Sequence, residues 1–575
     1  MAGESPSVKA PVDVPPGFWE WEASHHPKPL TPLGSSFLLD SFNQAWPKIF
    51  EEFGVLLESL EQREIGGYVY QKARPFGGRD SGGHTLPPKP IMWLLLRLHP
   101  AFRRRIARCK EAMGARLDRS LVERWYGEWR PRLIADIDRW RSVDLMSLPG
   151  EDLAVHLRDL REWMLNAASV HFNLAVAQIV PLALLTFFCR DRLGYGDQQV
   201  LPLFSGLSGA SSEPALELAK LADTIRPDVG LTEAVLAAGT REVPALLAKR
   251  RADVAAKFQE HLHHYGYRAL RYEVAEESLA ERPELVASLL QDELRRPTGL
   301  EAQQQRLSSA RVEAKAIALA ALKDDGQREE FLTLLADAER GYPIREDNEF
   351  FTISVPLALA RFAFLEAGKR LAASGVVAIA NDIFFLRYDE VISALVGRDA
   401  NHQELAAGRR EEYTATQAFD PPASYGRRPP TPPLDVLPPE ARLAMEVSAF
   451  SIERVFEPER SGRREESSAR EVRGIGASRG TYTGPARIIL GEEQFDKLQA
   501  GDVLVCPVTS PVWSILFAKV GALVTDSGGI LSHPAIIARE YGIPAVVATG
   551  NATGVIPDGQ QIVVDGEAGV VRVLG

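Results

Sequence analysis

Apolar residues recur at helical spacing through most of the chain. From about residue 36 to residue 405 they return every three or four positions, which places them on one face of an α-helix. The pattern is clearest in four stretches: 121–140, 153–187, 245–265 and 357–373. It predicts a large, mostly α-helical body, which we place at residues 17–417.

Glycine and proline interrupt this helical pattern in three places. They concentrate at residues 75–90, 206–213 and 297–299, where they favour loops over continuous helix. The interruptions allow two helical subdomains, and the pattern fixes no boundary between them.

Both flanks of the body have compositions that disfavour packed structure. Residues 1–16 are rich in proline, glycine and serine, so we expect a disordered tail. Residues 418–472 predict a spacer that combines three parts. A proline-dense tract at 421–439 is followed by a short helix at 440–456 and by a polar hinge at 457–472.

The pattern changes after residue 472. Short β-branched runs alternate with turns and with two short helical segments, which is typical of a mixed β and α domain. The expected strands are 486–490, 503–506, 522–525, 545–548, 561–564 and 570–574. We therefore expect a multidomain protein in which residues 473–575 form a compact β/α domain.

Composition excludes several classes of protein. The formal charge of -11 provides no general attraction for nucleic acid, and the three scattered cysteines suggest neither a disulfide framework nor a zinc site. The most apolar run, residues 179–188, is too short to span a bilayer, and the amino end lacks the apolar core of a secretion signal. We expect a cytoplasmic protein with no membrane partner.

One short segment carries recognisable chemistry. In DSGGILSHPAIIARE, Gly528 and Gly529 permit a tight turn, Ser532 can cap a helix, and His533 falls in the first helical turn. A phosphoryl group on that imidazole would face free backbone N–H groups, and Arg539 could add positive charge. The alternative from spacing alone is a surface histidine beside a helix cap.

Residues 473–575 resemble the swivelling phosphohistidine domain of the phosphoenolpyruvate-utilising enzymes. The resemblance covers the entry strand GIGASRGTYTGPARII, the loop GDVLVCPVTSP, the Gly-Gly-x-x-Ser-His core and the closing strands. It implies that His533 is transiently phosphorylated and that Ser532 and the two glycines support it. Pro534 departs from the small residue that is usual there, but proline is tolerated early in a helix.

The helical body resembles the acceptor-binding domain of the rifampin phosphotransferases. The resemblance is carried by WEWEASHHPKPLTPL at 19–33, HHYGYRALRYE at 263–273, REDNEFFTI at 345–353, and the segment 361–391, in the family's order. It implies that the body holds a small hydroxylated molecule, with aromatic molecules among the candidates.

The layout is similar to the phosphohistidine subunit of phenylphosphate synthase, in which the ATP-cleaving part is a separate chain. Residues 1–472 contain no P-loop and no glycine-rich strand-turn pair, and the sequence ends before any phosphoenolpyruvate-binding barrel. The resemblance then implies a split enzyme in which this chain binds no cofactor itself. ATP and Mg²⁺ would sit on an ATP-grasp partner, which cleaves ATP to AMP and phosphate.

Four residues of the body are candidates for binding the acceptor, and each has a structural alternative. Arg345 and Glu349 precede an apolar run, where a charged first turn of a helix is equally common. Arg268 follows a Tyr-Gly turn and could form an interdomain salt bridge instead. His171 lies in an apolar helical run, which is typical of a core histidine.

The sequence also raises a metal site and two functions other than an enzyme. His261 and His264 share a helical face but have no acidic ligand spaced with them, so we expect no metal site. The chain could also be a non-catalytic binding or regulatory protein, or a carrier that passes phosphate to another protein. The intact Gly-Gly-x-x-Ser-His core favours the enzyme.

Overall fold

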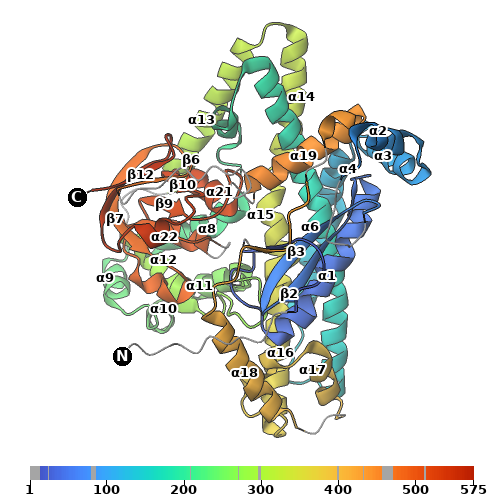
Figure 1. The fold of residues 1–575 in the computed structure, drawn as a ribbon. Coiled ribbons are helices and arrows are strands. Elements are labelled where there is room, and N and C mark those ends of the chain that lie inside the picture. Colours follow the sequence, from blue (N-terminus) through green and yellow to red (C-terminus); the bar gives the residue numbers. More distant parts are fainter. Residues whose placement is uncertain are drawn as a thin grey trace, which may run out of the picture.

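The computed structural model describes residues 13–23, 25–78, 86–207, 209–269, 271–295, 300–397, 401–430, 433–455, 470–509, 513–517 and 519–574. The expected tail up to residue 12, the loop at 297–299 and most of the expected hinge, residues 457–469, lie outside this part. The described residues form a large, mostly helical body and a β-rich C-terminal domain that lies against one side of it (Figure 1).

The body contains a sheet that the helical pattern did not predict. Its strands are β1 (Trp19–Trp21), β2 (Leu57–Ile65), β3 (Tyr68–Pro75) and β4 (Ser424–Tyr425), in the antiparallel order β2-β3-β1-β4. The predicted mostly helical body therefore also contains strands that the helical pattern did not indicate. Gly66 and Gly67 join β2 to β3 with φ of 62° and 88°, the turn geometry that favours a hairpin.

The proline-rich tract is bound to the body. Strand β4 lies within it and pairs with β1, and the hydroxyl of Tyr70 donates to the carbonyl of Pro422 at 2.7 Å. Farther along, Lys89 forms an ion pair with Asp435 at 2.7 Å. The tract thus follows the surface of the body up to the helix α19 (Pro439–Val455).

The helices before α8 include one very long helix, α6 (Gly150–Leu193). The shorter elements are α1 (Pro32–Glu52), α2 (Lys89–Leu98), α3 (Pro100–Gly114), α4 (Leu117–Arg124), the π-helical turn η1 (Trp125–Trp129), α5 (Arg130–Arg141), α7 (Asp197–Val200) and η2 (Leu201–Phe204). At 1.5 Å per residue, α6 is roughly 66 Å long. The run at 179–188 is therefore one part of a longer helix.

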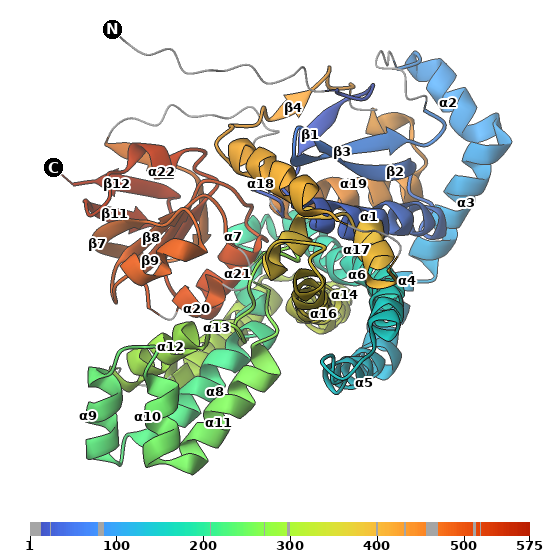
Figure 2. The ribbon, with the colours of Figure 1, turned by 90° about the horizontal axis from the view of Figure 1, so that it is seen from below.

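The remaining helices of the body complete two packing units. They are α8 (Gly209–Ile225), α9 (Val229–Ala237), α10 (Val243–Arg250), α11 (Ala252–Tyr265), α12 (Pro283–Arg295), α13 (Leu300–Ala321), α14 (Asp325–Gly341), α15 (Ile344–Glu349), η3 (Phe350–Ser354), α16 (Val355–Ala373), η4 (Ala380–Phe385), α17 (Tyr388–Leu395), α18 (Gln403–Gln417) and η5 (Leu434–Val436). Helices α8 to α12 have a core of their own and project from the rest (Figure 2). Helix α8 begins inside the loop expected at 206–213.

Two helical stretches are long and apolar enough to cross a membrane. They are Gly150–Leu193 and Asp325–Ala373, and 72% and 78% of their most apolar windows are buried inside the molecule. Helix α6 packs against α1, α4, α14 and α16, which accounts for its apolar composition. Burial of this kind is typical of core helices of a soluble protein.

The C-terminal domain is an eight-stranded mixed sheet with short helices. Its elements are β5 (Glu471–Arg473), β6 (Ile475–Ser478), β7 (Thr481–Ile488), η6 (Glu492–Lys497), β8 (Val503–Cys506), α20 (Ser514–Phe517), β9 (Ala522–Thr525), α21 (His533–Glu540), β10 (Ala545–Val547), α22 (Ala552–Val555), β11 (Gln561–Asp565) and β12 (Val570–Val573). The strand order is β5-β12-β11-β7-β8-β9-β10-β6, and β7 to β10 run parallel.

The expected mixed β and α domain is confirmed. Strands β8 and β9 have the predicted bounds, and both are fully buried, as expected for parallel strands covered on two faces. Strand β7 begins five residues before the predicted run, because the polar and small residues at its start do not look like strand. The sheet also includes β5, which starts at Glu471 rather than after residue 472.

We expect Phe364→Ala to destabilise the body by about 3–5 kcal/mol, because this fully buried ring packs edge-on against Phe37 at 5.1 Å. Urea unfolding of the body measures the change. Leu405→Ala, at a residue that is 39% exposed, serves as the control and should shift the transition by less than about 1 kcal/mol. Equal effects of the two changes would contradict this placement of the core.

Candidate functional site

The loop between β9 and α21 presents His533 at the start of a helix. Gly528 has φ of 102°, a value that favours glycine, and a Cβ on Gly529 would lie 2.2 Å from the carbonyl oxygen of Arg454. Both glycines are therefore required by geometry. Ser532 occupies the N-cap position, but its hydroxyl donates to the carbonyl of Gly529 at 2.6 Å instead of capping the helix.

Arg539 fixes this loop from the far end of the same helix. Its Nη1 donates to the carbonyl oxygens of Ile530 and Ala477, each at 2.9 Å. The side chain thus ties α21 to the preceding loop and to β6. The expected contact of Arg539 with a phosphoryl oxygen remains a prediction.

The ring of His533 lies against the body. Its Nδ1 is 3.3 Å from a carboxylate oxygen of Glu346 on α15, and both side chains are largely buried, with 15% and 7% exposed. Its Nε2 is buried and has no hydrogen-bond partner among the described residues. When Nδ1–H donates to the carboxylate, Nε2 carries the lone pair, and Nε2 is then the nucleophilic nitrogen.

Several contacts hold the C-terminal domain in this position. Arg454 pairs with Asp197 at 3.1 Å, and its carbonyl accepts from the backbone N–H of Leu531 at 2.8 Å. Gln198 donates to the carbonyl of Gly476 and accepts from Arg479. An apolar cluster also joins the two units: Leu279 and Leu285 of the body with Trp513, Leu516 and Phe517 of the domain.

The body supplies the other wall from segments far apart in the sequence. Around residue 25, His25 contacts Glu22 at 2.9 Å and lies edge-on to the ring of Tyr272, with 5.3 Å between the ring centroids. Burial, followed by the charges of Glu349 and Glu346, raises the pKa of Tyr272 well above its usual value. The segments 19–33, 263–273 and 345–353 therefore meet in one place.

Glu349 is a partly buried carboxylate within this wall. The hydroxyl of Ser354 donates to it at 2.6 Å, five residues along the chain, because η3 is a π-helical turn. Burial raises the pKa of Glu349, while the Ser354 hydrogen bond and the charges of Arg268 and His533 act in the opposite direction. A carboxyl group with a raised pKa is suited to proton transfer.

Two arginines accompany the carboxylates, and Arg268 is buried while Arg345 is partly buried. Burial lowers the pKa of Arg345, and the charge of Glu346 opposes that shift. Burial likewise lowers the pKa of Arg268, whose guanidinium lies 4.5 Å from the ring centroid of Phe350. The charges of Glu346 and Glu349 act on Arg268, and the charge of Glu346 acts on Arg345, so both arginines lie near these carboxylates.

His171 lies on α6 beside the site and is paired with its neighbours. Its Nδ1 is 2.9 Å from the hydroxyl of Thr352, and its carbonyl accepts from the amide of Asn348. Burial, with a smaller contribution from His25, lowers the pKa of His171 to about 3. The geometry fits a neutral core histidine, and an acid-base role for it stays a prediction.

Sequence reasoning did not single out Glu346, which has the closest contact with His533. It appeared only as a letter of the segment REDNEFFTI at 345–353, between the candidates Arg345 and Glu349. The available signal was the spacing of Glu346 and Glu349, since residues three apart share a helical face. Glu22 and Tyr272 were also missed, because no local pattern marks them.

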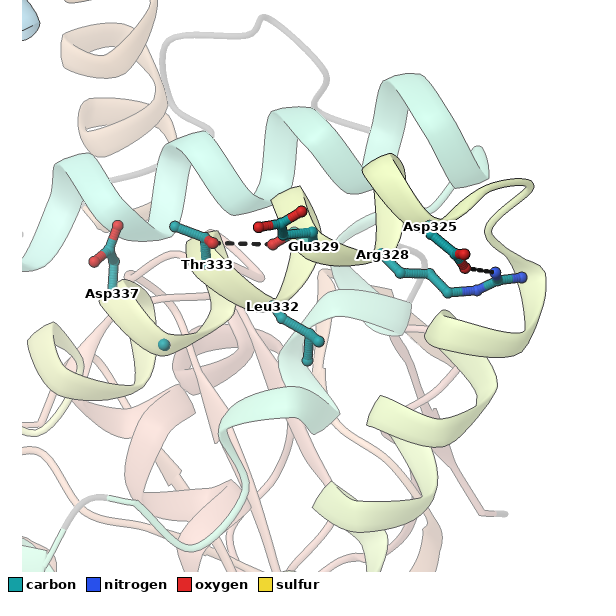
Figure 3. A pocket seen from close by; sticks show the side chains of 7 residues that line it. Asp325, Arg328, Glu329, Leu332, Thr333 and Asp337 are labelled. Carbon is teal, nitrogen blue, oxygen red and sulfur yellow. Dashed lines mark hydrogen bonds and ion pairs between the residues drawn. The ribbon is translucent and has the colours of Figure 1, made fainter.

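Two other features do not contribute to the site. Among the described residues, no group of three His, Cys, Asp or Glu side chains is arranged to hold a metal ion. A shallow hollow runs along the outside of α14 and is lined by Asp325, Arg328, Glu329, Leu332, Thr333, Ala336 and Asp337 (Figure 3). Arg328 pairs with Asp325 at 2.7 Å within this hollow.

Comparison with known proteins gives two family matches. Residues 498–569 match the mobile domain of PEP-utilising enzymes, and residues 171–346 match the fourth domain of rifampicin phosphotransferase. The first match contains His533 and Glu540, and the second ends with Arg345 and Glu346. The two matches therefore meet at the contact between His533 and Glu346.

Similar curated proteins include three phosphotransferases. The uncharacterized phosphotransferase YvkC of Bacillus subtilis is 28% identical over 97% of this chain and 62% of its own length. A rifampicin phosphotransferase from a Streptomyces species is 31% identical over 68% of this chain and 43% of its own length. One from Bacillus cereus is 46% identical over 20% of this chain and 13% of its own length. The chain thus spans less than two thirds of each relative.

The depressed pKa of His171 predicts a loss of stability in acid. The unfolded state, with a histidine pKa near 6.5, binds a proton below that pH, while folded His171 stays neutral down to about pH 3. Stability is therefore complete above about pH 6.5 and falls below it. Between pH 6.5 and pH 5, the free energy of unfolding should therefore fall by about 2 kcal/mol less for His171→Asn than for the unaltered chain.

Chemical denaturation at several pH values measures this difference. His263→Asn, at an exposed histidine, is the control and should keep the acid dependence of the unaltered chain. Parallel pH profiles for the unaltered chain and His171→Asn would show that His171 is not held neutral.

Proposed function

Because this chain carries the mobile domain of the PEP-utilising enzymes together with the fourth domain of rifampicin phosphotransferases, we propose that it is a phosphotransferase component in which His533 carries a phosphoryl group to a small hydroxylated acceptor. The helical body holds the acceptor, and the C-terminal domain delivers the phosphoryl group. The observation that carries the proposal is the contact of His533 Nδ1 with Glu346, which leaves the buried Nε2 as the available nucleophilic atom.

The transfer step uses the two nitrogens of His533 differently. The phosphoryl group resides on Nε2 while Nδ1–H donates to Glu346, which fixes the ring orientation. An acceptor hydroxyl attacks phosphorus, the P–N bond breaks and a P–O bond forms. The bonding electrons return to Nε2 as its lone pair, so the imidazole leaves as a neutral ring.

The residues around the ring supply proton transfer and charge. Glu349 receives the proton of the acceptor hydroxyl, a role supported by its burial and its raised pKa. Arg345 and Arg268 offset the negative charge of the phosphoryl oxygens during transfer. Ser354 orients the Glu349 carboxylate through its 2.6 Å hydrogen bond.

The surroundings of His171 support an aromatic or apolar acceptor. Phe172, the next residue on α6, contacts the rings of Trp46 and Phe42 from α1, with centroids at 4.2 and 5.5 Å. Trp46 and Phe42 are only partly buried, so they offer apolar surface next to the polar group of Thr352 and His171. Apolar walls with a few placed polar groups are typical of small-molecule sites.

The phosphoryl group comes, in this proposal, from a separate ATP-grasp subunit that binds ATP and Mg²⁺ and releases AMP and phosphate. The support is the absence of a P-loop or glycine-rich strand-turn pair from residues 1–472. A covalent phosphohistidine lets two separated sites share one nucleophile, since the carrier domain is labelled at one site and discharged at the other.

The purified chain alone should neither hydrolyse ATP nor become labelled. With an ATP-grasp partner and ATP labelled at the transferred phosphoryl group, it should gain an acid-labile, base-stable adduct. His533→Ala should abolish the label and all product, because the nucleophile is gone, whereas His171→Asn should keep the label. Continued labelling of His533→Ala would disprove the assignment. A label that no small hydroxylated molecule discharges would favour a carrier to another protein.

Glu349→Gln should slow discharge of the phosphohistidine to the acceptor by about 10² to 10⁴-fold while labelling of His533 continues, because only the proton acceptor is lost. Single-turnover transfer from the pre-labelled chain measures this rate. Glu330→Gln, at an exposed carboxylate on α14, is the matched control and should transfer at the normal rate. An unchanged rate in Glu349→Gln would remove Glu349 from the mechanism.

A further inference from the structure

Helix α2 carries an apolar stripe on its outer face. Ile91, Leu94, Leu95 and Leu98 are 50%, 49%, 38% and 63% exposed, and Trp93, on another side of the helix, is 48% exposed. The positions 91, 94, 95 and 98 follow the spacing of one helical face. The opposite face is the one that packs inward, through Leu96 against Val436 and its neighbours. A contiguous apolar patch of this kind is typical of an interaction surface.

The same helix pair is strongly basic. Residues 89–114, which cover α2 and α3, contain seven Lys or Arg and one Glu, so their net charge is 7 − 1 = +6, whereas the whole chain carries -11. The rest of the chain therefore carries -17. Arg103, Arg104 and Arg108 are exposed on α3, and the guanidinium of Arg97 lies 4.2 Å from the ring centroid of Trp93.

The helix pair lies at the edge of the molecule. In both views α2 and α3 are on the opposite side of the body from the C-terminal domain (Figures 1 and 2). A surface bound through α2 would therefore leave the C-terminal domain and the site around His533 facing away from it. The contact would not obstruct movement of that domain.

We propose that α2 and α3 dock this chain on the surface of an anionic lipid bilayer. The apolar stripe enters the boundary between headgroups and acyl chains, and the arginines of α3 contact anionic headgroups. An apolar face with clustered cations nearby is the pattern of helices that lie in a membrane interface. The -17 of the remaining chain orients the molecule, because an anionic surface repels it.

Charge decides between this occupant and a second copy of the chain. A two-fold contact through the stripe would bring two segments of +6 together, and like charges at close range disfavour such a contact. The sequence-based expectation of no membrane partner rested on the absence of a spanning segment and of a secretion signal. Docking on a surface requires neither.

Sedimentation of the full chain with vesicles tests the proposal. The chain should bind vesicles of 70% phosphatidylcholine and 30% phosphatidylglycerol, and should bind pure phosphatidylcholine far more weakly. Replacing Arg103, Arg104 and Arg108 with Gln should weaken partitioning by about 100-fold, since each cation near the surface contributes about 1 kcal/mol. The matched control replaces Arg192, Lys249 and Arg306, which are exposed elsewhere, and should bind normally.

The apolar contribution is tested separately. The double variant Leu94→Glu, Leu98→Glu should lose vesicle binding while its circular dichroism and thermal transition stay unchanged, because both residues are exposed. Val229→Glu, at a residue 66% exposed on α9, is the control and should bind normally. The proposal is overturned if the unaltered chain does not bind anionic vesicles. It is equally overturned if the double variant Leu94→Glu, Leu98→Glu binds them as well as Val229→Glu does. It is also overturned if light scattering shows a dimer that Leu94→Glu dissociates, or if a purified acidic protein occupies the stripe.

Discussion

The candidate site depends on one contact between two separately folded units. His533 belongs to the C-terminal domain and Glu346 to the helical body, and the 3.3 Å between them exists only while the two units are docked. Neither unit alone orients the imidazole or encloses it. Placing the pair away from water strengthens the hydrogen bond from Nδ1–H to the carboxylate, and it also makes either partner costly to bury without the other. Docking and the assembly of the site are therefore the same event.

This contact explains why the surrounding geometry is so constrained. The turn at Gly528 and Gly529 brings the backbone close to Arg454. Arg539 fixes the loop to β6 because it donates to the carbonyls of Ile530 and Ala477. Both constraints are needed for His533 to reach α15. On the other side, Arg345 and Glu349 come from the same short segment as Glu346, so one rigid element sets the positions of all three. The body contributes a wall of charged side chains, and the domain contributes His533, the nucleophile that we propose.

Local pattern was sufficient to predict the C-terminal domain and the position of His533, because short buried strands and a Gly-Gly turn before a helix leave direct traces in sequence. It was insufficient for the sheet of the body, where β1 and β4 are very short and pair across some 400 residues. It also could not identify the partner of His533. Glu346 looks like any charged residue in the first turn of a helix, and only the packing of two distant units gives it a distinct environment.

The π-helical turn η3 adds one residue to the wall of the site without changing the face that the following helix presents. A π-helical turn differs from an α-helix by a single inserted residue, so deletion of one residue between Phe350 and Ser354 would restore a regular helix. Ser354 would then follow Glu349 by four residues, a spacing that still shares one helical face, and α16 could keep its buried face in the core. In evolutionary terms, the fold and this hydrogen bond could both survive the loss of a single codon.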